Sequence, residues 1–356
     1  MMWAPDNPRM MVWCCVCAAL AAVAFRCRDV QYADGGPIEP SLFVSENITF
    51  ARILPGRLFD VFLVGENGLG LRNLTDHPAN DLNPQWSPDG TLLAFESTRE
   101  GVPNIFVIPA IGGAARNVSH IERGARECSW FPDSRRIAFQ GETLYGNDIY
   151  VVNLSDSSIQ NLTQGLGINL YPRCSPDGQK IAFASDRDSI WALYVVPVNG
   201  GNPQRLTEIS GFDQTFTLTW SPESGRLLYN LSTNATRDVF VINVDGTQKR
   251  NLTNHPADDV GGDWSPDGST IVFQSNRSGK DAVYRMDATG GNVARISAGM
   301  GDTAPLFSPN GSWVMFLSAR RGAYEIWVVS PGGFQEEVVT PSQISDRTPR
   351  WKPSVR

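Results

Sequence analysis

The chain has 356 residues, of which 41% are hydrophobic and 19% charged, so it has enough apolar residues for a core and is not a disordered polymer. Its net charge is −7, and no basic stripe is present, which argues against a nucleic-acid partner. The 33 glycines and 24 prolines are typical of many short strands joined by tight turns.

The first predicted element is an N-terminal apolar segment, residues 10–25, which carries no charge and is flanked by Arg9 and Arg26. A membrane-spanning helix needs about 20 apolar residues, whereas the core of a signal peptide needs about 7–15. Ala-Val-Ala at 22–24 supplies small residues for cleavage. Residues 1–25 are therefore predicted to be a signal peptide, with a short uncleaved membrane anchor as the alternative, and residues 26–41 a linker.

A repeat of 43–46 residues follows, marked by Trp-Ser-Pro-Asp-Gly at 86–90 and by six later versions of this string. Several strands in a unit of this length are typical of a β-propeller. The first residue of the string recurs in every unit, which predicts a core position between neighbouring sheets rather than a sugar-stacking platform. This position is occupied by Trp86, Trp130, Cys174, Trp220, Trp264, Phe307 and Trp351.

Each repeat is predicted to contain four strands. The aromatic residue ends the first strand, and Ser-Pro-Asp-Gly forms a tight turn into the second, as at 92–95. A polar loop leads to a β-branched and aromatic third strand, as at 104–107, and a glycine-rich turn leads to a fourth that ends in Asn-Leu-Thr, as at 161–163. Period-2 alternation and turn residues favour strands over helices.

The two ends of the repeat region predict how the ring closes. The last unit stops after its first strand, near Trp351, whereas residues 48–50, 60–63 and 73–75 match second, third and fourth strands that lack a first. Pairing of the C-terminal strand with this N-terminal blade would leave no open sheet edge between them. The sequence therefore predicts one all-β domain, residues 42–353, folded as a seven-bladed propeller of four-stranded blades.

The string Trp-Ser-Pro-Asp-Gly, the following Ile-Ala-Phe-x-Ser-x-Arg and the Leu-Thr end resemble the repeat of the TolB-like propellers, which belong to the wider WD-like group. The resemblance covers residues 42–353. It implies the fold, but the fold hosts binding proteins, peptidase accessory domains and a few lyases, so it does not by itself imply one function.

Two charged positions recur on the loops that are predicted to surround one mouth of the central channel. An aspartate lies five residues before the aromatic position in four units, and an arginine thirteen residues after it in four units. They either pair with each other structurally or form a charged rim that selects a partner's basic group or a cation. The residues are Asp81, Asp259, Asp302, Asp346, Arg99, Arg187, Arg277 and Arg320.

Two phenylalanines in the loop at 209–217, Phe212 and Phe216, are candidate apolar anchors for a partner, with packing over the core as the alternative. The three histidines, His77, His120 and His255, lie in loops on the same face. Histidine ligation marks the metal site of the oligogalacturonate lyases, which share this type of propeller. Here the histidines belong to separate blades, so no metal site and no cofactor are predicted.

The sequence contains no Gly-x-Ser-x-Gly elbow and no phosphate-binding glycine motif, so no catalytic residues are predicted. The favoured function is an exported, periplasmic or extracellular, non-enzymatic scaffold that binds a protein or peptide through the loops at one channel mouth. Membrane contact is expected only through an uncleaved N-terminal segment. The alternative is a carbohydrate-active enzyme, such as a metal-assisted polysaccharide lyase, that uses the same mouth.

Overall fold

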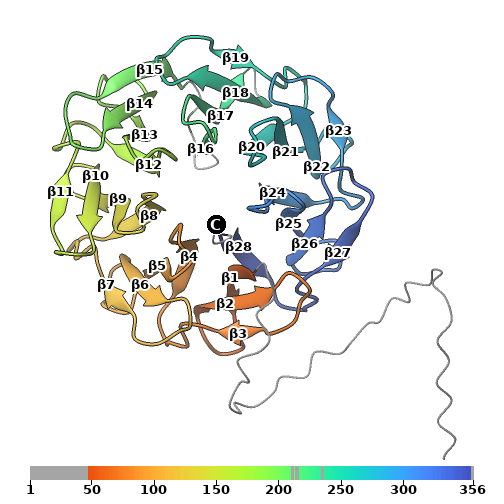
Figure 1. Ribbon diagram of the computed structural model, residues 1–356, viewed down its shortest axis with the longest axis horizontal. Helices are drawn as coiled ribbons and strands as arrows, with labels where there is room; N and C mark the ends of the chain where they lie inside the picture. The colour runs from red at the N-terminus through yellow and green to blue at the C-terminus, as the bar shows by residue number, and fades with distance from the viewer. Residues whose placement is uncertain (1–46, 210–211, 213–215, 234–235, 354–356) are drawn as a thin grey trace, which may run out of the picture. The chain divides into compact units, whose positions relative to one another are not determined.

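The computed structural model describes residues 47–209, 212, 216–233 and 236–353, and all regular elements in these ranges are β-strands. They form seven antiparallel four-stranded sheets arranged around a central channel (Figure 1), which confirms the predicted seven-bladed propeller. In the same ranges no helix has the length and apolarity needed to cross a membrane. The predicted signal peptide or anchor, the linker and the first propeller residues, 42–46, lie outside the described residues.

Each blade is numbered here in chain order, and its strands run from the channel outward. Blade 1 contains β28 (Asp346–Trp351), β1 (Asn47–Ile53), β2 (Phe59–Gly65) and β3 (Arg72–Asn73). Blade 2 contains β4 (Asp81–Trp86), β5 (Leu92–Ser97), β6 (Asn104–Pro109) and β7 (Arg116–Asn117). Blade 3 contains β8 (Ala125–Trp130), β9 (Arg136–Glu142), β10 (Asn147–Asn153) and β11 (Ile159–Asn161). Blade 4 contains β12 (Asn169–Cys174), β13 (Lys180–Ser185), β14 (Ala192–Pro197) and β15 (Gln204–Glu208).

The remaining three blades have the same plan. Blade 5 contains β16 (Leu218–Trp220), β17 (Arg226–Thr233), β18 (Thr236–Asn243) and β19 (Arg250–Asn251). Blade 6 contains β20 (Asp259–Trp264), β21 (Thr270–Ser275), β22 (Ala282–Asp287) and β23 (Ala294–Arg295). Blade 7 contains β24 (Asp302–Phe307), β25 (Val314–Ser318), β26 (Glu325–Val329) and β27 (Glu336–Val338).

The ring closes as the sequence predicts, because the C-terminal strand β28 is the innermost strand of blade 1. It pairs antiparallel with β1, with Trp351 opposite Ile48 and Asp346 opposite Arg52. Arg52 and Asp346 also form a buried ion pair, with Nε and Oδ1 2.6 Å apart. Backbone pairing and side-chain charge thus join residues almost 300 positions apart in the chain.

The recurring aromatic position packs between neighbouring blades, as predicted. Trp86, Trp264 and Phe307 are buried in clusters that combine side chains of two adjacent sheets. Trp130 donates from its indole nitrogen to the Gln85 carbonyl of the preceding blade at 2.9 Å, and Trp220 and Trp351 make the equivalent bond. Cys174 is half-buried rather than buried, and its sulfur donates to the Ser129 carbonyl at 3.5 Å.

A β-bulge interrupts six of the seven described innermost strands, three residues before the aromatic position. The bulged residue has a left-handed backbone, with φ of 53° at Glu127 and 47° at Thr348. An extra residue bends a strand and re-aims its side chains, and residues at and beside the bulges line the channel, among them Asn83, Glu127 and Arg350. A β-branched threonine in this conformation is strained, by about 1–3 kcal/mol.

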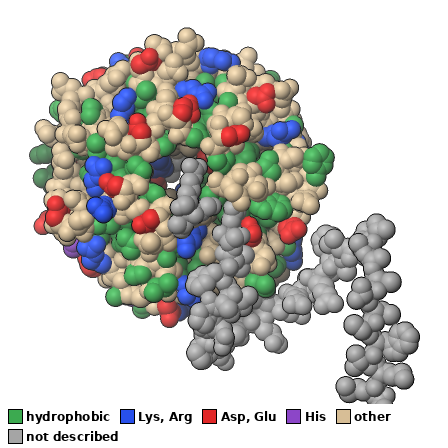
Figure 2. Space-filling view, viewed as in Figure 1, with side chains coloured by type: hydrophobic (Ala, Val, Ile, Leu, Met, Phe, Trp, Pro, Cys, Tyr) green, Lys and Arg blue, Asp and Glu red, His purple; other side chains and the backbone are tan. Residues whose placement is uncertain are grey.

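The propeller has two different faces. We call the side with the Ser-Pro-Asp-Gly and glycine-rich turns the turn face. We call the other side, where the second strand leads to the third and the fourth leads to the next blade, the mouth face. Figure 2 shows one face of the ring, with acidic and basic side chains interspersed and a hollow at its centre. No field of a single charge sign covers this visible face.

Candidate functional site

The predicted arginine–aspartate pairs are present on the mouth face, as one repeated arrangement. In blade 2, Arg99 Nη2 lies 2.9 Å from Asp81 Oδ2, and Arg99 Nε donates to the Ser97 hydroxyl at 2.9 Å. The guanidinium lies over the adjacent rings of Phe95 and Phe106, about 5 Å from each centroid. Equivalent contacts join Arg277 to Asp259, Arg320 to Asp302, Arg187 to Asn169 and Arg52 to Asp346.

The four aspartates of this arrangement are completely covered. Asp81, Asp259, Asp302 and Asp346 have no exposed surface, whereas the Arg99 side chain keeps 13% exposure. Burial raises the pKa of the Asp81 carboxyl, although Ser97 and Arg99 oppose that shift. The aspartates therefore hold the arginines in place. Arg99, Arg277 and Arg320 keep 13–18% of their side-chain surface exposed, whereas Arg52 is buried with Asp346.

Phe212 and Phe216 belong to an aromatic cluster between blades 4 and 5. Phe216 is buried in the core cluster that joins these blades, and Phe212 packs against it. Phe212 stacks on Trp191 with ring centroids 4.0 Å apart, and both phenylalanines contact Tyr171 at centroid distances near 6 Å. The structure thus places both residues where they pack over the core beside the channel mouth.

A row of exposed apolar side chains crosses the mouth face of blades 3 and 4, and sequence reasoning did not single it out. Leu144, Tyr145, Leu166 and Ile190 are 51–90% exposed. Their loops touch closely: a Cβ added at Gly146 would lie 3.0 Å from Ile168, and one at Gly167 would lie 2.6 Å from Arg187. We call these four residues the apolar ridge. The signal in the sequence was weak, because isolated apolar residues in loops are common.

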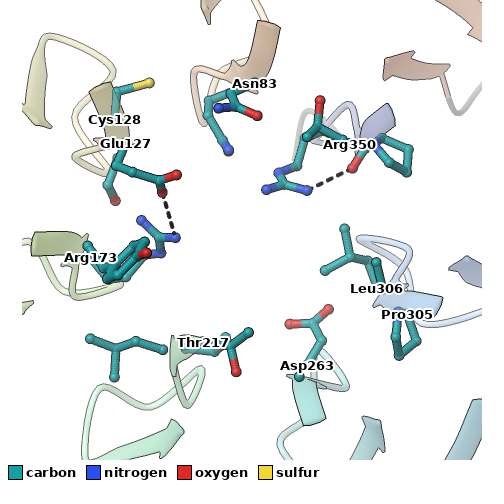
Figure 3. Close-up of a pocket in the computed structure, with 18 of the residues that line it drawn as sticks. Asn83, Glu127, Cys128, Arg173, Thr217, Asp263, Pro305, Leu306 and Arg350 are labelled. Carbon is teal, nitrogen blue, oxygen red and sulfur yellow. Dashed lines mark hydrogen bonds and ion pairs between the residues drawn. The ribbon is translucent and has the colours of Figure 1, made fainter. Parts of the chain in front are cut away.

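The central channel forms a cavity of about 1240 Å³ (Figure 3). Its wall runs from mouth-face residues such as Tyr324 to turn-face residues such as Pro353. The bulged strands supply charged side chains of both signs, which Figure 3 shows directed into the space. Glu127 and Arg173, from blades 3 and 4, form an ion pair at 3.3 Å. This lining was missed from sequence because the bulge positions share no residue type.

Asp263 projects into the channel from β20 and also joins two blades. Its Oδ2 accepts the backbone N–H of Phe307 at 2.9 Å. Burial raises the pKa of this carboxyl to about 6, against the smaller opposing effects of the Phe307 N–H and the Arg350 charge. An ionised Asp263 at neutral pH therefore costs folding free energy.

Asp263→Asn is expected to raise the free energy of unfolding by about 2 kcal/mol at about pH 7.5. The amide oxygen still accepts from Phe307, and the cost of burying a charge is removed. Since the folded-state pKa lies above the unfolded value of about 3.9, the native carboxyl contributes stability below about pH 4 and loses it as pH rises through about 6. Urea unfolding of the native protein and the variant at about pH 4 and about pH 7.5 measures the difference. An equal increase in the free energy of unfolding at the two pH values would contradict the prediction.

A protein-family model described as the TolB beta propeller domain matches residues 46–143, 123–217 and 209–356, together most of the chain. The chain belongs to this TolB propeller family. Among curated proteins, one from Agrobacterium fabrum is 36% identical over 92 residues, 26% of this chain and 31% of the relative. The Tol-Pal system protein TolB of Francisella tularensis is 32% identical over 96 residues, 25% of this chain and 22% of the relative. The chain thus matches less than a third of the length of either relative.

Solved structures agree with the fold of this TolB-like propeller. TolB from Acinetobacter baumannii has a TM-score of 0.57 at 20% identity, over 86% of this chain and 66% of that one. An oligogalacturonate lyase in complex with manganese has a TM-score of 0.61 at 15% identity, over 72% of this chain and 75% of that one. At these identities the likeness establishes the fold alone.

The histidines of the TolB-like propeller serve their own loops. His77 Nδ1 accepts the backbone N–H of Ala79, and His255 Nδ1 that of Ala257, each at 3.1 Å. His120 is exposed on a separate loop. Within the described ranges, no group of three or more His, Cys, Asp or Glu side chains is arranged to hold a metal ion.

Proposed function

We propose that this chain is an exported, non-enzymatic TolB-like propeller that binds a protein or peptide partner through the loops of its mouth face. The observation that carries the proposal is the apolar ridge on blades 3 and 4. Exposed apolar side chains that gather on adjacent loops, rather than scattered single residues, mark protein interaction sites. Tyr145 is 90% exposed, and tyrosine is one of the residue types enriched among the energetically dominant residues of such interfaces.

The arginines of the mouth face complete the proposed surface. Each is fixed by its aspartate or asparagine and by two aromatic rings, so little side-chain entropy is lost when a partner contacts it. Arg187 lies in the loop that also carries Ile190, directly beside the ridge. Phe212 and Phe216 support the neighbouring loop through Trp191. We expect binding of moderate salt dependence, because charges of both signs lie near the surface.

The metal-assisted lyase remains the less favoured function. The His77 and His255 ring nitrogens that accept loop N–H groups are not free to bind a metal without breaking those bonds. A lyase would also need an acid and a base that converge with a metal at the mouth. The described residues offer binding surface instead.

Photo-crosslinking tests the proposed surface with a matched pair of positions. p-Benzoylphenylalanine replaces Tyr145 on the mouth face or Phe334 on the turn face, which are 90% and 91% exposed. We expect a discrete protein or peptide adduct from position 145 only, in cells of the source organism. Tyr145→Ala should weaken binding of that adduct partner at least tenfold, and Phe334→Ala should leave it unchanged.

Equal adducts from both positions, or none from position 145, would contradict the mouth-face proposal. N-terminal sequencing of the same recovered protein tests export. A chain beginning near Phe25 supports a removed signal peptide, whereas membrane-bound protein that retains Met1 supports the anchor alternative.

A further inference from the structure

Arg350 lies in β28 and directs its guanidinium into the channel (Figure 3). Its Nη1 donates to the Pro349 carbonyl at 2.9 Å. With the Gln85 amide oxygen facing it, Nε and Nη2 donate to that oxygen at 3.0 and 3.2 Å. A guanidinium has five N–H donors, so these three contacts leave two unused.

Arg350 lies in the channel wall without an acidic partner. Among the described residues, Arg187, which is held by Asn169, and the exposed Arg347 also have no ion pair. Arg173 is paired with Glu127, and the mouth-face arginines of blades 2, 6 and 7 are paired with aspartates. Within the described residues, no carboxylate lies within 4 Å of a nitrogen of Arg350. Burial lowers the pKa of its guanidinium, and the positive charge of Arg173 adds to this effect. Arg350 is half-buried, so a charge without a counter-ion is partly desolvated there, and an anionic ligand would offset that cost.

The charged groups around Arg350 come from three other blades. Arg173 and Glu127 are neutralised by each other, and Asp263 faces the channel on the other side of Leu306. Cys128, from blade 3, is buried and neutral, because burial and nearby carboxylates raise the pKa of its thiol. Asp263 is the one described acid near Arg350 that has no ion-pair partner within 4 Å, and it disfavours an anion until it is protonated.

The channel has room for more than a single ion. Its volume of about 1240 Å³ exceeds the ~300–1,000 Å³ of ordinary small-molecule pockets. We propose that the channel is a carboxylate-binding site, in which Arg350 receives a carboxylate from a peptide that enters through the mouth face. A peptide offers this group either at its C-terminus or on an acidic side chain. The inference rests on the proposed function and names the chemistry that the partner must carry.

Three defined peptides test the site by isothermal titration calorimetry with the full chain. N-acetyl-trialanine has a free C-terminal carboxylate, N-acetyl-trialanine amide has none, and N-acetyl-Ala-Glu-Ala amide carries the carboxylate on a side chain. We expect at least one acid peptide to bind and the uncharged amide not to bind. The tighter of the two acid peptides identifies the source of the carboxylate.

Arg350→Gln should weaken binding of the acid peptide about tenfold or more, because it removes a charge-assisted, forked donor. Arg350→Lys, which keeps the charge but loses the fork, should give an intermediate affinity. Arg135→Gln, which removes an exposed charge on the turn face, should leave affinity unchanged. Cooperative thermal unfolding checks that each variant folds, and the Lys variant and the pH series below remain informative if the Gln variant does not.

The affinity of the native protein for the acid peptide should increase between about pH 7.5 and pH 5.5, as Asp263 is protonated. Asp263→Asn should remove this increase. Equal binding of acid and amide peptides, an unchanged affinity in Arg350→Gln, or no binding of either acid peptide up to its solubility limit would overturn the inference. If the acid peptide binds but no adduct forms from position 145, the carboxylate site is supported and the proposed mouth-face partner is contradicted.

Discussion

Deletion of residues 346–356 is expected to abolish cooperative unfolding of the whole propeller. The deletion removes β28, leaves one edge of β1 without backbone partners, and uncovers Ile48 and Phe50, which are completely buried. Exposing these side chains costs about 1.5–3 kcal/mol each, and an unpaired Arg52 about 3–5 kcal/mol. Their sum is comparable to the ~5–15 kcal/mol by which a typical domain is stable. Differential scanning calorimetry of the full and shortened chains measures whether the cooperative unfolding transition is lost.

Removal of residues 354–356 alone is the control, because it retains every pair of the β1–β28 ladder. That variant should melt like the full chain. If the chain without residues 346–356 also keeps its melting temperature and enthalpy, closure by β28 contributes nothing to stability, and the argument from blade 1 fails.

Asp81→Ala is expected to lower the free energy of unfolding by about 3 kcal/mol. The change leaves the Arg99 guanidinium without its counter-ion, over two aromatic rings and with little exposure. Asp81→Asn should cost less than about 1 kcal/mol. Blade 4 shows why: there Arg187 Nη2 donates to the amide oxygen of Asn169 at 2.9 Å, the same distance as in the Arg99–Asp81 pair. Urea unfolding of the two variants measures the difference.

Asp89→Ala is the comparison variant, because exposed Asp89 accepts hydrogen bonds from Ser87 and Thr91 in a turn and forms no ion pair among the described residues. It measures the loss of a carboxylate acceptor without the loss of an arginine's counter-ion. The triple change of Asp81, Asp259 and Asp302 to Asn should leave a folded propeller, since each amide can reproduce the Asn169 arrangement. Similar losses for Asp81→Ala and Asp81→Asn would show that the charge, rather than the hydrogen-bond acceptor, holds Arg99.

The four-strand repeat could be predicted because each part of it depends on local chemistry. Ser-Pro-Asp-Gly turns, β-branched third strands and an aromatic residue between sheets require the same residue types in each blade. The closure by β28 was also predictable, because the N-terminal blade lacked a first strand and the C-terminal unit consisted of a first strand only. The spacing of Asp81 and Arg99 suggested either a pair or a rim, and only the structure shows that the aspartate lies beneath the arginine.

The sequence by itself determined the fold, the number of blades, their closure and the face on which the variable loops lie. The tertiary structure alone decided what lines the channel and where the apolar ridge lies. Bulge positions such as Glu127 and Thr348 share a backbone conformation but no residue type, so no sequence motif identifies them. Arg350 and Asp263 lie far apart in the sequence, and their proximity arises only when seven sheets close into a ring. The ridge likewise joins loops of two blades, and contacts between blades are set by packing rather than by local sequence.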